Sequence, residues 1–145
     1  MRFPILASLL AATLASTSFA AESARFDLTV DITGIRSGAG KIRAVLCTAQ
    51  ERFPDSCRIS SIATAVVGNT TLVFHGVPDG VYALAAFHDE NGNGQLDIGN
   101  GFPKEGLAFS NNVMGERGVP AFSASAFKLI QHSRLPVRMR YLGAR

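Results

Sequence analysis

Residues 25–33 read Arg-Phe-Asp-Leu-Thr-Val-Asp-Ile-Thr, and this stretch decides the fold class. Apolar side chains occupy every second position, at Phe26, Leu28, Val30 and Ile32, and polar side chains stand between them. Successive side chains of a β-strand point to opposite faces of the sheet. This period of two therefore predicts a strand with one buried face.

Further strands are predicted downstream, at residues 41–48, 59–67, 70–75, 81–87, 124–130 and 135–142. Glycine-containing turns separate most of the first five strands, a polar loop or helical turn with Pro54 separates the second from the third, and no stretch after residue 20 has a convincing helical period. The stretch 81–87 is apolar on both faces, which is typical of a central strand. About seven short strands predict an all-β chain, folded as an antiparallel β-sandwich of the immunoglobulin-like kind.

A hairpin is expected where the fourth and fifth of these strands meet, at Pro78-Asp79. In that hairpin His75 would lie opposite Tyr82. His88 would then lie roughly 20 Å from His75, at about 3.4 Å per strand residue. The two histidines are therefore not expected to share a metal ion.

The first twenty residues have the features of a secretory signal peptide. Arg2 gives a positive start, an apolar run follows from Pro4 to Ala15, and small residues stand at Ser18 and Ala20. Cleavage is expected after Ala20, which leaves residues 21–145 as one domain in the periplasm or outside the cell. A transmembrane anchor is the alternative, but the run is short and rich in Ala, Ser and Thr, so we expect no transmembrane segment.

Two cysteines, Cys47 and Cys57, follow the signal peptide. An even count in an exported chain predicts a disulfide, with a metal-binding or catalytic thiol as the alternative.

The net charge of the chain is only +3, which is too balanced to indicate nucleic-acid binding. Arg138 and Arg140 share one predicted strand face, which is either solvated or a contact for an anionic lipid or glycan.

The stretch Asp89-Glu90-Asn91-Gly92-Asn93-Gly94-Gln95-Leu96-Asp97 resembles a calcium-binding loop in its spacing. Side-chain oxygens are available at Asp89, Asn91, Asn93 and Asp97, and the backbone carbonyl of Gln95 adds another ligand. Ca²⁺ takes six to eight oxygen ligands, and a glycine at the sixth position, here Gly94, permits the sharp turn. We therefore expect a structural Ca²⁺ ion in this loop.

The loop departs from the EF-hand pattern at its twelfth position, where Asn100 replaces the bidentate glutamate. Glu105 is the nearest substitute and would have to fold back over residues 99–104. The alternative is a turn without metal, held by hydrogen bonds of its own Asn and Asp side chains. With two or three carboxylates the affinity for Ca²⁺ should be modest, with a Kd of about 10⁻⁴–10⁻³ M.

A family resemblance rests on the runs Val77-Pro78-Asp79-Gly80-Val81-Tyr82-Ala83-Leu84, His88 to Asp97, Gly101-Phe102-Pro103-Lys104-Glu105-Gly106, Phe109-Ser110-Asn111-Asn112, and Phe122. These runs resemble a bacterial family of exported proteins catalogued as domain of unknown function 2141. The Pro-Asp-Gly-x-Tyr turn and the loop after it are also similar to transthyretin-like and carboxypeptidase-regulatory-like sandwiches. The resemblance implies the sandwich fold and no particular activity.

Residues 89–123 form a long segment without predicted strands, yet the segment carries apolar residues that a disordered chain rarely exposes. If a metal ion orders its first turn, one surface could present Phe102, Phe109, Asn111 and Asn112 to a ligand. The alternative is that the phenylalanines are core residues and the asparagines hold turns. The ligand class stays open among a glycan, a peptide and another envelope protein.

Two functions remain open. The first is a non-catalytic binding or interaction module whose Ca²⁺ ion rigidifies the recognition loop. The second is a small periplasmic hydrolase that uses the carboxylates of the same loop. Ser110 lacks the flanking glycines of a nucleophile elbow, and no nucleophile–base pair is evident, which favours the binding module.

Overall fold

The computed structural model describes residues 22–116 and 118–143 and is built almost entirely of strands. The predicted signal peptide, residues 1–20, lies outside the described residues. The all-β class is confirmed, and the two helical elements are one turn each, η1 (Ser110–Asn112) and α1 (Phe122–Ser125). Among the described residues no helix has the length and apolar character needed to cross a bilayer.

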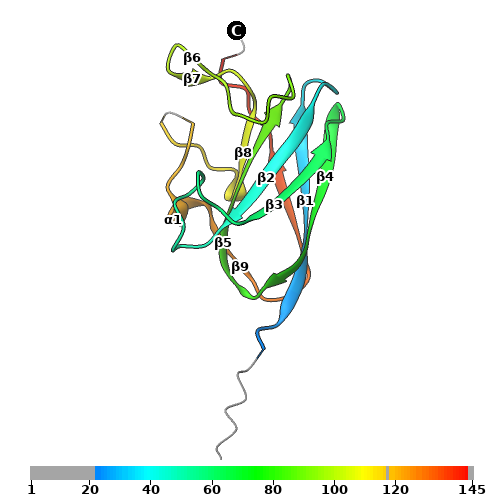
Figure 1. Ribbon diagram of the computed structural model, residues 1–145, viewed down its shortest axis with the longest axis vertical. Helices are drawn as coiled ribbons and strands as arrows, with labels where there is room; N and C mark the ends of the chain where they lie inside the picture. The colour runs from blue at the N-terminus through cyan, green and yellow to red at the C-terminus, as the bar shows by residue number, and fades with distance from the viewer. Residues whose placement is uncertain (1–21, 117, 144–145) are drawn as a thin grey trace, which may run out of the picture.

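Two main sheets form the molecule (Figure 1). The first has three strands in the order β10 (Ser133–Arg138), β1 (Arg25–Ile35) and β4 (Gly68–Pro78). The second has the order β3 (Ile59–Thr64), β2 (Lys41–Cys47), β5 (Gly80–Asp89) and β8 (Leu107–Phe109), and β9 (Ala126–Leu129) also pairs with β5. A separate hairpin joins β6 (Ile98–Gly99) to β7 (Phe102–Pro103).

The core lies between the two main sheets. The alternating residues Leu28, Val30 and Ile32 of β1 are at most 1 % exposed, as the period of two predicts. They belong to one apolar cluster with side chains from the second sheet, among them Ile42 and Leu84. β1 therefore buries one face in this cluster, and burial of each such side chain contributes about 1.5–3 kcal/mol.

Two details of the pairing differ from the sequence-based expectation. β1 and β10 run parallel, with Val30 opposite Leu135, so the molecule is not purely antiparallel. β4 and β5 belong to different sheets, so the predicted hairpin and its pairing of His75 with Tyr82 are wrong. β4 instead pairs with β1, and β5 pairs with β2.

The long segment after β5 is ordered by short elements, which the alternation of polar and apolar residues in the sequence could not predict. β8 adds three residues to the edge of β5, with Ala86 opposite Ala108. All three residues of β8 are buried, so the strand has no polar face. β5 therefore has partners on both sides, β2 on one and β8 with β9 on the other, which confirms its central position.

Candidate functional site

The polar loop of residues 90–97 begins where β5 ends, at Asp89. This residue lies opposite Lys41 of β2 and is fully buried. The chain passes close by at Gly40, where φ is +68° and an added Cβ would lie 1.8 Å from the carbonyl oxygen of Asp89. Only glycine fits at that position, and the close approach fixes the start of the loop.

The two carboxylate oxygens of Asp89 have different surroundings. Oδ2 lies 2.6 Å from Nε of Arg43 and accepts the backbone N–H of Gly94 at 3.0 Å. Oδ1 is buried and has no hydrogen-bond partner in the described chain. Burial acts to raise the pKa of Asp89, but Arg43, the Gly94 N–H and, more weakly, the Gly92 N–H outweigh it, so the pKa lies below its usual value. The carboxylate is therefore ionised, with one oxygen unsatisfied.

Asn and Asp side chains hold the remainder of the loop. Oδ1 of Asn91 accepts the N–H of Asn93 at 3.0 Å, and Oδ1 of Asn93 accepts the N–H of Gln95 at 2.8 Å. The amide nitrogens of both asparagines donate to the carboxylate of Asp97, at 2.6 Å from Asn91 and 3.2 Å from Asn93. Gly94 has a φ of +78°, as the sharp turn requires. Asn91, Asn93 and Asp97 are thus joined in one turn, and Asp89 is linked to that turn through the N–H of Gly94.

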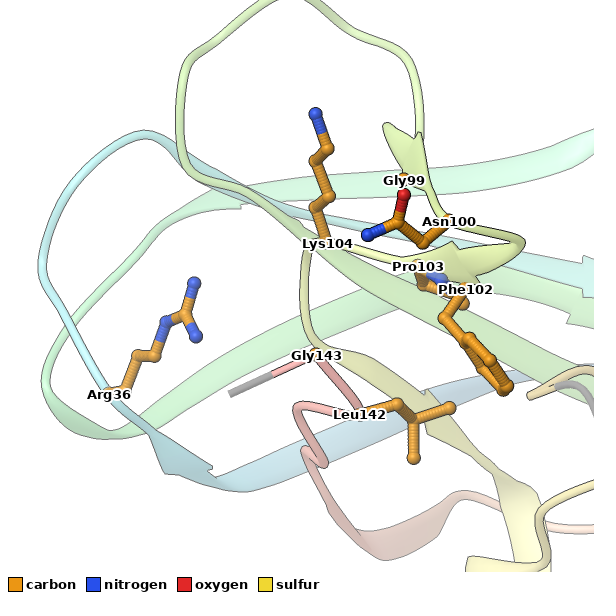
Figure 2. Close-up of a pocket in the computed structure, with 8 residues that line it drawn as sticks. All are labelled: Arg36, Gly99, Asn100, Phe102, Pro103, Lys104, Leu142 and Gly143. Atoms are coloured by element: carbon orange, nitrogen blue, oxygen red, sulfur yellow. The ribbon is translucent and has the colours of Figure 1, made fainter. Parts of the chain in front are cut away.

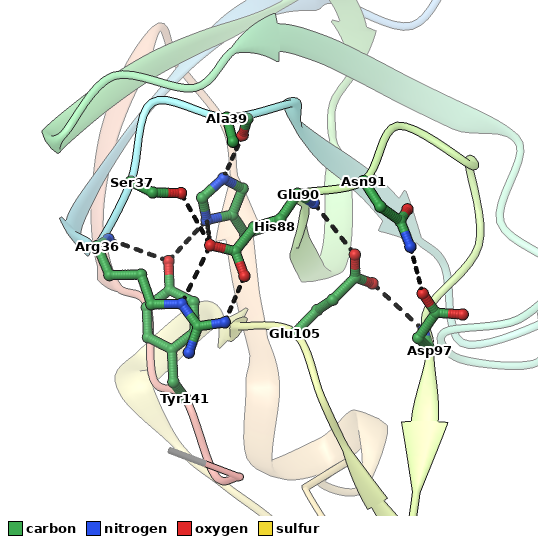
Figure 3. A network of polar contacts seen from close by, with 9 residues as sticks. All are labelled: Arg36, Ser37, Ala39, His88, Glu90, Asn91, Asp97, Glu105 and Tyr141. Carbon is green, nitrogen blue, oxygen red and sulfur yellow. Dashed lines mark hydrogen bonds and ion pairs between the residues drawn. The ribbon is translucent and has the colours of Figure 1, made fainter. Parts of the chain in front are cut away.

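Glu105 folds back onto this loop. Its two carboxylate oxygens accept the backbone N–H groups of Glu90 and Asp97, at 3.1 and 3.2 Å (Figure 3). Burial, with the charges of Asp97 and Asp89, raises the pKa of Glu105. Asn100 itself lies in the turn between β6 and β7, at a φ of +53°. Glu105 therefore joins the start of the loop to its end.

A second polar network surrounds His88, which is fully buried one residue before Asp89. Its Nε2 lies 2.8 Å from the carbonyl oxygen of Ala39, and its Nδ1 lies 2.7 Å from the hydroxyl of Tyr141 (Figure 3). A carbonyl oxygen only accepts, so Nε2 carries a proton and donates it to Ala39. His88 thus ties the end of β5 to two distant segments.

Arg36 belongs to the same network. Its Nε donates to Oε1 of Glu90 at 3.0 Å, its Nη2 pairs with Oε2, and its guanidinium carbon lies 4.2 Å from the ring centre of Tyr141. Arg36, with the hydroxyl of Ser37, lowers the pKa of Glu90. Periodicity could not predict this cluster, because its members lie about 50 residues apart in the sequence.

The four residues predicted as one binding surface do not lie together on one. Phe102 is 49 % exposed, whereas Phe109 is buried and stacks edge-on against Phe53. Asn111 donates to the carbonyl oxygens of Ala124 and Ala126, and Asn112 accepts the N–H of Arg138. Three of the four therefore order the segment internally, and only Phe102 presents an apolar side chain to solvent.

Phe102 lines a cleft of about 650 Å³ with Arg36, Gly99, Asn100, Pro103, Lys104, Leu142 and Gly143. Figure 2 shows Arg36 on one side of this cleft and Phe102 with Leu142 on the other. The cleft lies next to the polar loop because the hairpin β6–β7 begins directly after Asp97. The N–H of Lys104 donates to the carbonyl oxygen of Asp97 at 2.9 Å and closes this hairpin.

Other candidate chemical groups have structural partners. Cys47 and Cys57 form the predicted disulfide, which joins the end of β2 to the segment before β3. Ser110 is buried, and its hydroxyl accepts the N–H of Leu84 and donates to the carbonyl oxygen of Ser125. Within residues 22–116 and 118–143, no three His, Cys, Asp or Glu side chains are grouped so that they could hold a metal ion.

Comparison with known proteins gives one match. The family model described as "Uncharacterized protein conserved in bacteria (DUF2141)" matches residues 30–136, from β1 into β10. No curated protein and no solved structure matches the chain. The matched range contains the whole polar loop, Glu105 and most residues of the cleft.

Proposed function

This chain belongs to the DUF2141 family of bacterial proteins, and from its geometry we propose a non-catalytic binding module that acts outside the cytoplasm. Its polar loop, residues 90–97, holds a Ca²⁺ ion together with Asp89. The ion fixes the β6–β7 hairpin and with it the cleft beside Phe102.

One observation carries the metal proposal: the buried Oδ1 of Asp89 has no partner. An unsatisfied buried carboxylate oxygen costs several kcal/mol, because it has lost water and gained no donor. A hard cation at Oδ1 removes this cost while Oδ2 keeps its bonds to Arg43 and Gly94. A set of carboxylate, amide and carbonyl oxygens is the donor chemistry that Ca²⁺ takes.

The asparagines fit the same proposal. In the absence of metal, the amide nitrogens of Asn91 and Asn93 supply the partial positive charge that faces Asp97. A cation in that place provides a full charge, and rotation of the two amides turns their oxygens toward it. Such a donor set combines carboxylate oxygens with amide and backbone carbonyl oxygens.

The loop is connected to the cleft by backbone hydrogen bonds. Asp97 receives the N–H of Lys104 at its carbonyl and donates its own N–H to Glu105. The segment 98–103 between these contacts forms the hairpin that lines the cleft. A loop held more rigidly at Asp97 therefore positions Phe102 and Lys104 more rigidly as well.

We also propose that the fold is a transthyretin-like or carboxypeptidase-regulatory-like sandwich. Two sheets that share one apolar cluster support this arrangement. Sandwiches commonly carry binding surfaces on the loops at one end, where a rigid scaffold positions them. The polar loop and the β6–β7 hairpin lie at the same end of the molecule in Figure 1.

Export is supported by the disulfide between Cys47 and Cys57, because such bonds persist in oxidising compartments. The expected mature N-terminus is Ala21. Intact-mass measurement of protein from the envelope fraction tests this, and recovery of uncleaved chain in the cytoplasm would contradict it.

The hydrolase alternative requires a carboxylate free to act as nucleophile or base. In the described chain, Asp97 and Glu105 accept hydrogen bonds from within the loop, and Oδ2 of Asp89 pairs with Arg43. These contacts are suited to ordering a loop, which is why we propose binding rather than catalysis.

Thermal unfolding in millimolar Ca²⁺ and in chelator tests the metal proposal. Ca²⁺ should raise the melting temperature, since a ligand at one to ten times its Kd adds about 0.4–1.4 kcal/mol to the free energy of unfolding. Asp97→Asn should reduce the response, and Asp55→Asn, which changes an exposed carboxylate outside the loop, should leave it unchanged. Hydrogen exchange should slow across residues 98–109 and stay constant in β1. Identical unfolding and exchange in both buffers would overturn the calcium site.

A further inference from the structure

The cleft beside Phe102 has the size and mixed lining of a small-molecule site. Its volume of about 650 Å³ lies within the range of about 300–1,000 Å³ that is common for such sites. Three separate segments form it: the loop at Arg36, the β6–β7 hairpin with Lys104, and the C-terminal residues Leu142 and Gly143.

The charged side chains of the cleft are cationic. Arg36 and Lys104 both line it, and no carboxylate is among the lining residues of the described chain. Arg36 uses Nε and Nη2 for Glu90, so Nη1 stays available for another acceptor. Within residues 22–116 and 118–143, no carboxylate forms an ion pair with Lys104.

Both cations are positioned before any ligand arrives. Arg36 is held by Glu90 and by the ring of Tyr141. The alkyl stem of Lys104 lies across Gly99, where an added Cβ would be only 2.3 Å from Cε of the lysine. Side chains that are ordered in advance lose less conformational entropy on binding, which favours affinity.

The opposite side of the cleft is apolar and unusually open. Phe102 is 49 % exposed and Leu142 is 42 % exposed, although each has a large apolar side chain. An exposed apolar pair beside two cations matches a ligand with a charged end and an apolar end, since each end then meets its complement.

We propose that this cleft binds an amphipathic anion, with its carboxylate or phosphate at Arg36 and Lys104 and its apolar part over Phe102 and Leu142. This inference rests on the binding role proposed above and names the ligand class of that site. A free amphiphile and the headgroup region of an anionic lipid share this chemistry.

The test uses the mature protein in saturating Ca²⁺ and titrates it with octyl phosphate and with octanoate, by calorimetry. Inorganic phosphate carries only the charged end, and octyl glucoside carries only the apolar end. We expect both amphipathic anions to bind at least about tenfold more tightly than either control, because each control loses one of the two contacts.

Variants locate the site. Lys104→Gln should weaken octyl phosphate binding about tenfold, the loss of one charge-assisted hydrogen bond. Phe102→Ser should weaken it as well and should leave the affinity for inorganic phosphate unchanged. Lys128→Gln is the matched control, because Lys128 is exposed on β9, which lies at the other end of the molecule (Figure 1).

Vesicles that contain an anionic phospholipid form the second arm. Binding of octyl phosphate alone supports a free ligand, and Lys104-dependent binding of both supports a lipid headgroup. Equal affinity for octyl phosphate and octyl glucoside, or binding that Lys104→Gln leaves unchanged, overturns the proposal. The same titration in chelator separates the two ideas: Lys104-dependent binding without any Ca²⁺ effect retains the cleft and removes the metal.

Discussion

Asp89 and Arg43 form an ion pair in which only one carboxylate oxygen takes part, with Oδ2 at 2.6 Å from Nε of the arginine. The aspartate is fully buried, whereas the arginine side chain is 29 % exposed. A buried carboxylate needs a counter-charge, and this one has its counter-charge on one side and an open oxygen on the other. The ion pair with Arg43 therefore lets the loop fold without metal, and the second carboxylate oxygen of Asp89 remains the proposed ligand for a cation.

Replacement of Arg43 by Met should expose this dependence. Arg43→Met leaves the buried carboxylate of Asp89 without its partner, and removal of one member of such a pair costs about 3–5 kcal/mol. A bound Ca²⁺ ion would supply part of the missing charge, so the loss measured by urea unfolding should be smaller in Ca²⁺ than in chelator. Arg58→Met, at a side chain that is 91 % exposed, should cost little in either buffer. A loss of the same size with and without Ca²⁺ would contradict a cation at Asp89.

Asn111 should stabilise the segment after β8 in two separable ways. Its φ of +60° disfavours most side chains, and its amide donates to two carbonyl oxygens. Asn111→Gly retains the backbone freedom and loses the hydrogen bonds, at about 1 kcal/mol. Asn111→Ala loses both, at about 2 kcal/mol. Equilibrium unfolding should rank the two variants in this order, and equal stability of Ala and Gly would remove the backbone contribution.

The ion pair between Glu90 and Arg36 should make stability depend on pH in the acid range. Arg36 lowers the pKa of Glu90 below its ordinary value of 4.5, so the unfolded chain takes up this proton first. The contribution is complete above the ordinary value and is lost as the pH falls through the lower pKa of the folded state. The difference in melting temperature between the wild type and Glu90→Gln should be constant from pH 7 to about 5.5 and shrink below. A difference in melting temperature that grows on acidification would contradict a lowered pKa of Glu90 in the folded state.

Loss of the disulfide should destabilise the fold moderately. Cys47 and Cys57 are ten residues apart, and closure of a loop of this size contributes about 2–3 kcal/mol through the entropy of the unfolded chain. The double variant Cys47→Ala/Cys57→Ala should therefore unfold at lower denaturant concentration. Wild-type protein under reducing conditions is the control and should lose a similar amount.

Sequence reasoning located the seven longer strands to within a few residues, because each has an alternating or fully apolar pattern at a readable length. It missed β6, β7 and β8, which have only two or three residues each. Elements this short have no period to read. It also misassigned β4 and β5 to one hairpin, since the turn at Pro78-Asp79 joins two sheets rather than two neighbouring strands.

The loop residues could be named in advance, because their spacing is local. The cleft could not, since Arg36 and Leu142 reach it from opposite parts of the chain. The prediction of a four-residue binding surface assumed that its Phe and Asn side chains face a ligand. Phe109 is core, and Asn111 and Asn112 satisfy backbone groups, which is the common use of these residue types inside an ordered segment.

The parallel pairing of β1 with β10 places the first and the last strand of the described chain side by side. Val30 meets Leu135 across about one hundred residues, and β1 lies in the middle of its sheet, so that sheet is incomplete until β10 has been made. Contacts of such long range slow folding, because a long loop must close before they form. The central strand of this sheet therefore gains its second partner only after residues 133–138 have been synthesised, so we expect the sheet to form late in folding.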